Sequence, residues 1–184
     1  MGGGFPPKLY ADLKARPEAV RELARELLSA HFPESLHESI ASSVGLDLEA
    51  SLRGLHRDPA FRSGVVAAWN HTCAFCGFSL QLDHADIALD AAHIRWCQFG
   101  GPDTLNNGIA CCSIHHQAFD RGAFSISDDH RILISSRLYG HGGMDSILAL
   151  NRQPLREPNR KGAAPRVNFL SWHRTQVFRG DARD

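Results

Sequence analysis

Two pairs of residues have the types and spacing of a zinc site. Cys73 and Cys76 form a Cys-x-x-Cys pair before Gly77, and Cys112 with His115 repeats the spacing 36 residues after Cys76. Two thiolates on a tight turn reach one ion, and four nitrogen and sulfur ligands close a tetrahedral site without leaving a position for substrate. These residues predict a structural zinc, with buried free thiols as the alternative.

The other two cysteines, Cys97 and Cys111, are predicted not to bind this zinc. Cys111 is adjacent to Cys112 on a short strand, so its side chain points to the opposite face. Cys97 falls in a predicted loop. Five cysteines is an odd number, and all five lie in the stretch from residue 73 to residue 112, near histidines. This pattern favours metal binding in a reducing cytoplasm over a disulfide-stabilised secreted protein.

A second set of residues in the same stretch could bind a catalytic metal ion. On a helix His116 points about 100° away from His115, so it cannot easily share the zinc. Asp120 lies four residues later, on the same helical face as His116. An imidazole and a carboxylate on one face can bind a divalent ion that keeps open water positions. His93, on the preceding predicted strand, can face the same ion.

These residues resemble the HNH endonuclease family, whose nuclease domains have the ββα-metal fold. The resemblance rests on "DAAHI", "GGPDTLNNGIACC" and "HHQAFDRGAF". These stretches are most like the nuclease domains of modification-dependent restriction enzymes, in which the HNH domain follows a separate reader domain. The resemblance covers about residues 70 to 135 and continues more loosely into "FLSWHRTQVF".

The resemblance implies a role for each matching residue. His93 matches the general base, Asn107 the residue that orients the base or supports the metal loop, and His116 a metal ligand. Asp120 falls where some members place a further ligand.

One position departs from the family pattern. Many members carry Asp or His immediately before the base as a metal ligand, whereas Ala92 stands there in this chain. The nearest upstream carboxylate is Asp90. Either Asp90 takes the role through a bulged strand, or fewer protein ligands and more water hold the ion.

The residue types suit hydrolysis of a phosphodiester. A neutral imidazole near pH 7 can take a proton from water, and a divalent cation can neutralise charge on the phosphorus centre and stabilise the leaving oxygen. The resemblance implies cleavage of DNA to 5′-phosphate ends by a homodimer. It implies Mg²⁺ or Mn²⁺ as the catalytic ion beside the structural zinc.

Two other functions remain open. A non-catalytic zinc-ribbon module that binds nucleic acid would keep the four zinc ligands but would not need His93, Asn107 and His116. A nuclease toxin acting on DNA or RNA would use the same chemistry on another substrate.

Helices and short strands are predicted to position these residues, which gives an α+β fold. Pro17 opens a helix through "PEAVRELARELLSAHF", "ESLHESIASSVGL" gives a second, and Asp58-Pro59 begins a third that runs to about His71. The apolar residues of the first predicted helix that should face inward are Val20, Leu23, Ala24, Leu27 and Leu28.

The pattern changes after His71. Strands are predicted at 86–94 and in "IAC", followed by the short helix "SIHHQAFD", which ends at Gly122. A hairpin formed by "AFSIS" and "RILIS" follows, then a closing helix through "FLSWHRTQVF". We expect a helical N-terminal annex at 1–70, the HNH core with its zinc knuckle at 71–136, and a basic extension at 137–184.

The charge distribution suggests where DNA would bind. The chain has 20 Lys+Arg and 20 Asp+Glu, so its net charge is zero. Residues 1–130 carry 10 basic and 16 acidic residues, a balance of −6, whereas residues 131–184 carry 10 and 4, a balance of +6. The extension could therefore supply phosphate contacts. The predicted DNA-binding residues are Arg152, Arg156, Arg160 and Lys161; a solvated surface with uneven charge is the alternative.

The composition favours a globular domain. With 43% hydrophobic and 22% charged residues among 184, the chain can form a core, and it has no apolar run of about 20 residues that would span a membrane. "MGGGFPPKLY" lacks the features of a signal peptide. No base-reading module is recognisable, so we expect a reader domain upstream.

Overall fold

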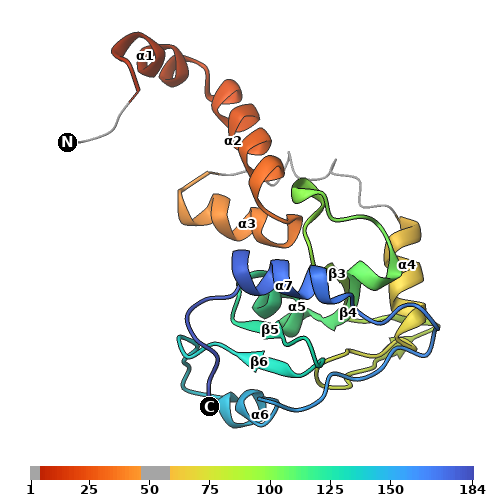
Figure 1. Ribbon diagram of the computed structural model, residues 1–184. Coiled ribbons are helices and arrows are strands. Elements are labelled where there is room, and N and C mark those ends of the chain that lie inside the picture. Colours follow the sequence, from red (N-terminus) through yellow and green to blue (C-terminus); the bar gives the residue numbers. More distant parts are fainter. Residues whose placement is uncertain (1–4, 47–58) are drawn as a thin grey trace. The chain divides into compact units, whose positions relative to one another are not determined.

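The computed structural model describes residues 5–46 and 59–184. The chain divides between Leu55 and His56 into two compact units. The first unit contains α1 (Pro7–Ala15), α2 (Pro17–His31) and α3 (Glu34–Ser43). The second contains the helices α4 (Pro59–Ala68), α5 (Ser113–Asp120), α6 (Met144–Leu148) and α7 (Val167–Gln176), and the 3-10 turns η2 (Cys97–Phe99) and η3 (Leu105–Asn107). Its strands are β1 (Gln81–Leu82), β2 (Ala85–Asp86), β3 (Leu89–His93), β4 (Gly108–Cys112), β5 (Phe124–Ile126) and β6 (Ile132–Ile134) (Figure 1).

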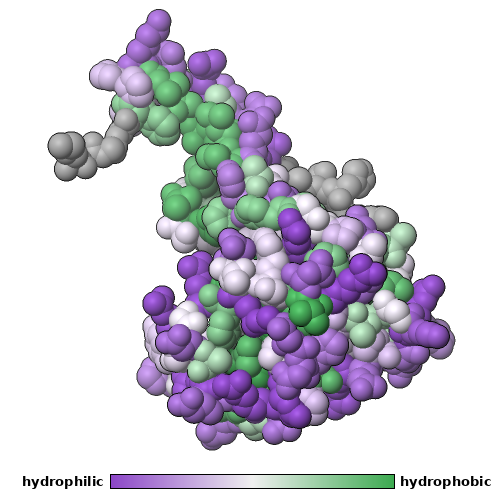
Figure 2. Space-filling model, viewed as in Figure 1, coloured by the Kyte–Doolittle hydropathy of each residue, from purple (hydrophilic) through white to green (hydrophobic). Residues whose placement is uncertain are grey.

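The first unit has the two helices predicted from the sequence, but its core is small. Leu28 and Ala41 are buried between α2 and α3. Leu23 and Leu27, which were predicted to face inward, are 46% and 60% exposed, because two short helices can bury only one strip of each other. Figure 2 shows apolar side chains (green) along these helices. Helix α1 was not predicted.

The second unit is built around the antiparallel pair β3–β4, with helix α5 directly after it. The register pairs Leu89 with Cys112 and His93 with Gly108. Phe61 and Val65 of α4 pack against this pair. A Cβ at position 108 would lie 2.3 Å from Val65 Cγ2, so glycine there permits the close approach of α4 to β4. Asp58, the predicted cap of α4, lies outside the described residues.

A single hydrophobic core joins most elements of the second unit. Its buried members come from α4, β3, β4, α5, β5, β6 and α7, and from Leu155 and Ala163. The predicted division placed α4 in the N-terminal annex and residues 137–184 in a separate extension. The structure differs because both segments supply apolar side chains to the core around β3–β4.

Helix α7 also supports the loop after β3. Trp172 lies against Trp96 and Phe99 of that loop, with ring centroids 5.7 and 5.6 Å apart. The predicted hairpin is present as β5–β6. In residues 5–46 and 59–184, no helix has the length and apolar character needed to cross a membrane.

Candidate zinc site and nuclease site

The four predicted zinc ligands converge. Their ligand atoms all lie within 4.8 Å of one another. His115 Nδ1 is 3.1 Å from Cys112 Sγ and 3.7 Å from Cys73 Sγ, and the Sγ atoms of Cys76 and Cys112 are 4.0 Å apart. Neighbouring ligand atoms of a tetrahedral zinc are roughly 3.3–3.8 Å apart, given Zn–N and Zn–S bonds of about 2.0 and 2.3 Å. The four residues therefore fit a zinc ion with only small adjustments.

The local backbone explains how Cys73 and Cys76 reach one point. The Gly77 amide donates to Cys73 O (2.9 Å), and the Cys73 amide donates to Phe78 O (2.8 Å), which closes a tight turn. Gly77 has φ +77°, a conformation that favours glycine. The hydrogen bond from Cys112, and another from His115, lower the pKa of Cys73 to about 3 despite its burial. A thiolate is the form that binds zinc.

Cys111 is not part of this cluster, as predicted. Its thiol is buried, and its Sγ lies 3.7 Å from Ile109 O. Burial raises the pKa of the Cys111 thiol well above its ordinary value. A protonated, enclosed thiol is a poor metal ligand.

His93 ends β3 and is held on two sides. Its Nε2 lies 2.7 Å from Asp103 Oδ1 and 3.2 Å from Cys97 Sγ. Its ring stacks on Phe61 of α4, with centroids 3.9 Å apart and an interplanar angle of 7°. Neither contact was predicted from the sequence, because Asp103 belongs to no recognisable motif of metal ligands and Cys97 falls in a predicted loop.

Asn107 fixes the loop that carries these partners of His93. The Asn107 side chain is fully buried. Its Oδ1 accepts from the Arg95 amide (2.9 Å), and its Nδ2 donates to the carbonyls of Arg95 and Pro102 (both 3.0 Å). One amide therefore ties the start of the loop to its end. This arrangement fits the supporting role that the family resemblance implies for Asn107.

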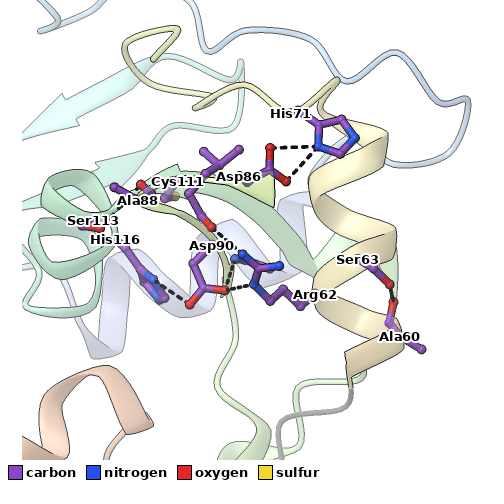
Figure 3. A network of polar contacts seen from close by, with 12 residues as sticks. Ala60, Arg62, Ser63, His71, Asp86, Ala88, Asp90, Cys111, Ser113 and His116 are labelled. Carbon is purple, nitrogen blue, oxygen red and sulfur yellow. Dashed lines mark hydrogen bonds and ion pairs between the residues drawn. The ribbon is translucent and has the colours of Figure 1, made fainter. Parts of the chain in front are cut away.

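His116 lies between two carboxylates. Its Nδ1 is 3.8 Å from Asp90 Oδ2, and its Nε2 is 3.2 Å from Asp120 Oδ2. Asp90 also accepts from Arg62 Nε (3.0 Å), and Arg62 Nη2 donates to the carbonyl of Leu89 (2.7 Å). Figure 3 shows Asp90 between His116 and Arg62.

This arrangement differs from the expected shell in two ways. Asp90 and Asp120 approach opposite nitrogens of His116, so the three do not converge on one point. In the described parts of the chain, two groups of three or more metal-binding side chains converge: the Cys73 cluster, and His93 with Cys97 and Asp103. Asp90 and His93 are three residues apart on β3, so strand alternation turns them to opposite faces.

Comparison with known families identifies the segment that contains these residues. Residues 73–127 match the model of the HNH endonuclease family. The segment belongs to the HNH endonuclease family.

A solved structure extends the likeness beyond the HNH segment. The chain resembles a modification-dependent restriction endonuclease, TagI, with 25% sequence identity and a TM-score of 0.52. The similarity covers 68% of this chain and 40% of that one, so this chain spans about two fifths of the length of TagI. Comparison with curated proteins found no match.

Three of the four predicted DNA-binding residues lie together outside the HNH segment. Arg156, Arg160 and Lys161 line a hollow of about 630 Å³, together with His130 and Pro165. Arg156 also lies against the zinc knuckle, where a Cβ on Gly77 would be 2.3 Å from its Nη2. Arg152 is not among the residues that line the hollow; its carbonyl accepts from Arg131 Nη1 (3.1 Å).

Proposed function

We propose that the second unit is a metal-dependent HNH endonuclease domain that hydrolyses phosphodiester bonds in DNA. The observation that carries the proposal is the 2.7 Å contact between His93 Nε2 and Asp103, within a segment that matches the HNH family. An imidazole oriented by a carboxylate at the end of a strand is suited to take a proton from water. A zinc-ribbon module that only binds nucleic acid would not need it.

The contacts of His93 support a separate role for each of its two nitrogens. The Asp103 carboxylate accepts, so Nε2 carries the proton and Nδ1 keeps the lone pair. Nδ1 is therefore the nitrogen that takes the proton from the attacking water. The imidazolium that forms is stabilised by Asp103, while the stacked Phe61 ring holds its plane.

His116 and Asp90 would hold the divalent ion. Their facing atoms, an imidazole nitrogen and a carboxylate oxygen, are donors that Mg²⁺ and Mn²⁺ accept, and water would complete the shell. Asp120 would accept from Nε2–H and orient the ring, as carboxylates behind metal-binding histidines do. When bound, the ion would neutralise charge on the phosphate and stabilise the leaving oxygen.

The outer edge of β3 is where His93 and His116 could act on one phosphate. In the common family pattern the metal ligand immediately precedes the base, so strand alternation turns these two side chains to opposite faces as well. The opposite orientation of Asp90 and His93 is therefore compatible with a metal ion and a base that act on the same phosphate. β4 pairs with the other edge of β3. Arg62, with its side chain 42% exposed, sits at this outer edge beside Leu89 and Asp90. A phosphodiester lying along it would meet Arg62 between the two faces.

Three further properties are part of the proposal. Arg152, Arg156, Arg160 and Lys161 would bind DNA phosphates, which the shared hollow supports for the last three. A homodimer would bring two sites to the two DNA strands, and the exposed Leu23 and Leu27 offer apolar surface for the dimer contact.

The likeness to TagI supports the proposal that this chain is the nuclease part of a modification-dependent restriction enzyme. The corresponding test compares methylated and unmethylated copies of one plasmid; equal rates with the full-length protein would exclude that dependence.

The nuclease function is tested with His93→Ala in a plasmid-nicking assay containing Mg²⁺ or Mn²⁺. Loss of a general base lowers the rate by roughly 10²–10⁴-fold, while fold, zinc content and DNA affinity should be retained. The control is His84→Ala, which removes an exposed imidazole. Cleavage by His93→Ala within a few-fold of wild type would overturn the assignment of the base. Faster cleavage of RNA than of DNA would favour the nuclease-toxin alternative.

A further inference from the structure

The three side chains at the end of β3 meet at a single point. His93 Nε2 is 2.7 Å from Asp103 Oδ1 and 3.2 Å from Cys97 Sγ. The Cys97 Sγ and Asp103 Oδ1 atoms are 3.6 Å apart. The three side chains form one of the two groups of three or more converging metal-binding side chains in the described residues, and they share no residue with the Cys73 cluster. The nuclease proposal uses His93 and Asp103 but has no role for the Cys97 thiol.

The loop presents this group to solvent in a fixed shape. Cys97 begins the turn η2, and Asp103 follows the two glycines that end it. Asn107, the last residue of η3, holds the carbonyls of Arg95 and Pro102, so both ligand-bearing parts of the loop are anchored to one buried side chain. Cys97 and Asp103 are exposed, and the side chain of His93 is 22% exposed, so an ion can reach all three.

We propose that His93, Cys97 and Asp103 form a second transition-metal site, which takes Zn²⁺ or Co²⁺ and switches off the base when it is filled. One nitrogen, one sulfur and one oxygen ligand, with a water in fourth position, suit a borderline ion. Their tetrahedral separations would be roughly 3.3–3.6 Å, so the largest change needed is an opening of roughly 0.6 Å between His93 Nε2 and Asp103 Oδ1. A hard Mg²⁺ ion does not select a thiolate ligand, so it would not compete for this site.

The loss of activity follows from proton counting, and this part rests on the proposed nuclease function. A neutral imidazole has one proton and one lone pair. An ion on Nε2 uses the lone pair there, so the single proton must sit on Nδ1. Nδ1 then cannot accept a proton from water. The Cys97 thiol loses its proton to solvent when it binds the ion, and no electron transfer is involved.

Metal binding is tested with Co²⁺, independently of nuclease activity. The protein is first loaded with one equivalent of Zn²⁺ to fill the Cys73 cluster, and Co²⁺ is then added. We expect a near-ultraviolet thiolate-to-cobalt band that saturates at one further equivalent. Cys97→Ser should abolish the band, and Asp103→Asn should weaken binding by at least roughly tenfold. Cys111→Ala and Asp12→Asn are the matched controls. A band that is absent in wild type, or unchanged in Cys97→Ser, would overturn the site without affecting the nuclease proposal.

Inhibition is then tested by adding Zn²⁺ to the nicking assay at constant Mg²⁺. Each variant is compared with its own rate before zinc is added. Wild type should lose activity over the zinc range in which the site fills, and Cys97→Ser should need at least roughly tenfold more zinc. If zinc fills the site but leaves the rate unchanged, or raises it, the switching role is wrong. If neither protein cleaves DNA at any zinc concentration while cobalt still binds, the nuclease proposal fails and the metal site stands.

Discussion

At the scale of single residues, the two neighbouring histidines of α5 have separate surroundings. His115 turns Nδ1 toward three thiols, whereas His116 lies between Asp90 and Asp120. The angle between adjacent helical residues explains this separation. Because the two side chains have separate surroundings, His116 can be substituted without removing a residue of the Cys73 cluster.

His116→Ala should therefore abolish cleavage stimulated by Mg²⁺ or Mn²⁺ and leave bound zinc and thermal stability close to wild type. Asp120→Asn should have a milder effect, a roughly 10–100-fold weaker apparent affinity for the divalent ion, because Asp120 only orients the ring. The measurements are zinc content by elemental analysis and nicking rates across a divalent-ion titration. Loss of zinc from His116→Ala would mean that His116, and not His115, is the fourth zinc ligand.

At the scale of elements, the Cys73 cluster joins the turn after α4 to the start of α5. Such a closed site contributes folding free energy, because the ion binds the folded arrangement and not the unfolded chain. Cys112→Ser should therefore lose zinc and unfold at a markedly lower temperature. Cys111→Ala removes the neighbouring buried thiol and should keep zinc. Thermal unfolding with and without a chelator compares them; a Cys112→Ser protein as stable as Cys111→Ala would contradict a structural role.

Helix α7 contributes a buried histidine whose titration can be followed. His173 Nε2 donates to the carbonyl of Phe119 (3.2 Å), so its Nδ1 accepts from Ser125 Oγ (2.9 Å), and the ring stacks on that of Phe119. Burial lowers the pKa of His173 from 6.5 to about 4. The neutral form is therefore the one that the fold accommodates.

The free energy of unfolding should decrease as the pH is lowered from about 6.5 to about 4. In this window the unfolded chain binds a proton on His173 that the folded chain excludes, so the loss reaches about 3 kcal/mol near pH 4. Above pH 6.5 both states are neutral at this residue, and it adds no pH dependence. Denaturant unfolding at several pH values compares wild type with His173→Gln, which should have a shallower slope, and with the exposed His141→Gln. Equal slopes for wild type and His173→Gln would contradict the assignment.

The elements show which parts of the fold could be predicted from sequence and which could not. The helices that begin at Pro17, Glu34 and Ser113 and the strands around His93 and Ile109 follow from local spacing and from proline and glycine signals. The four residues of the Cys73 cluster could be predicted to converge because Cys-x-x-Cys spacing is local as well. The partnership of His93 with Asp103 depends on how a ten-residue loop folds back, which no periodic pattern encodes. The exposure of Leu23 depended on how little surface α3 could cover.

At the scale of the whole molecule, the hollow lined by the basic residues has none of the proposed catalytic groups in its lining. Arg156, Arg160 and Lys161 surround one hollow, whereas His93 and His116 lie on β3 and α5. Binding and chemistry should therefore be separable by substitution.

Replacing Arg156, Arg160 and Lys161 together by Gln should weaken binding to all DNA sequences about equally. It should also reduce the salt dependence by roughly 0.9 in log–log slope per lost phosphate contact. The single-turnover rate at saturating DNA should stay close to wild type. The control replaces Lys8, Lys14 and Arg21 of the first unit by Gln, which changes the net charge equally. An unchanged slope in the first triple variant would mean that the extension is only a solvated surface, and would direct attention to Arg62, Arg95 and Arg121.

The core shared by α4, the β3–β4 pair and α7 limits how this nuclease could be transplanted. The family match spans 73–127, and a graft cut at those limits would leave behind Phe61, Val65, Phe169 and Leu170. The graft would also lose the ring that stacks on His93 and the helix that supports Trp96. A fusion should therefore keep residues 59–184 together, a stretch more than twice as long as the matched segment 73–127.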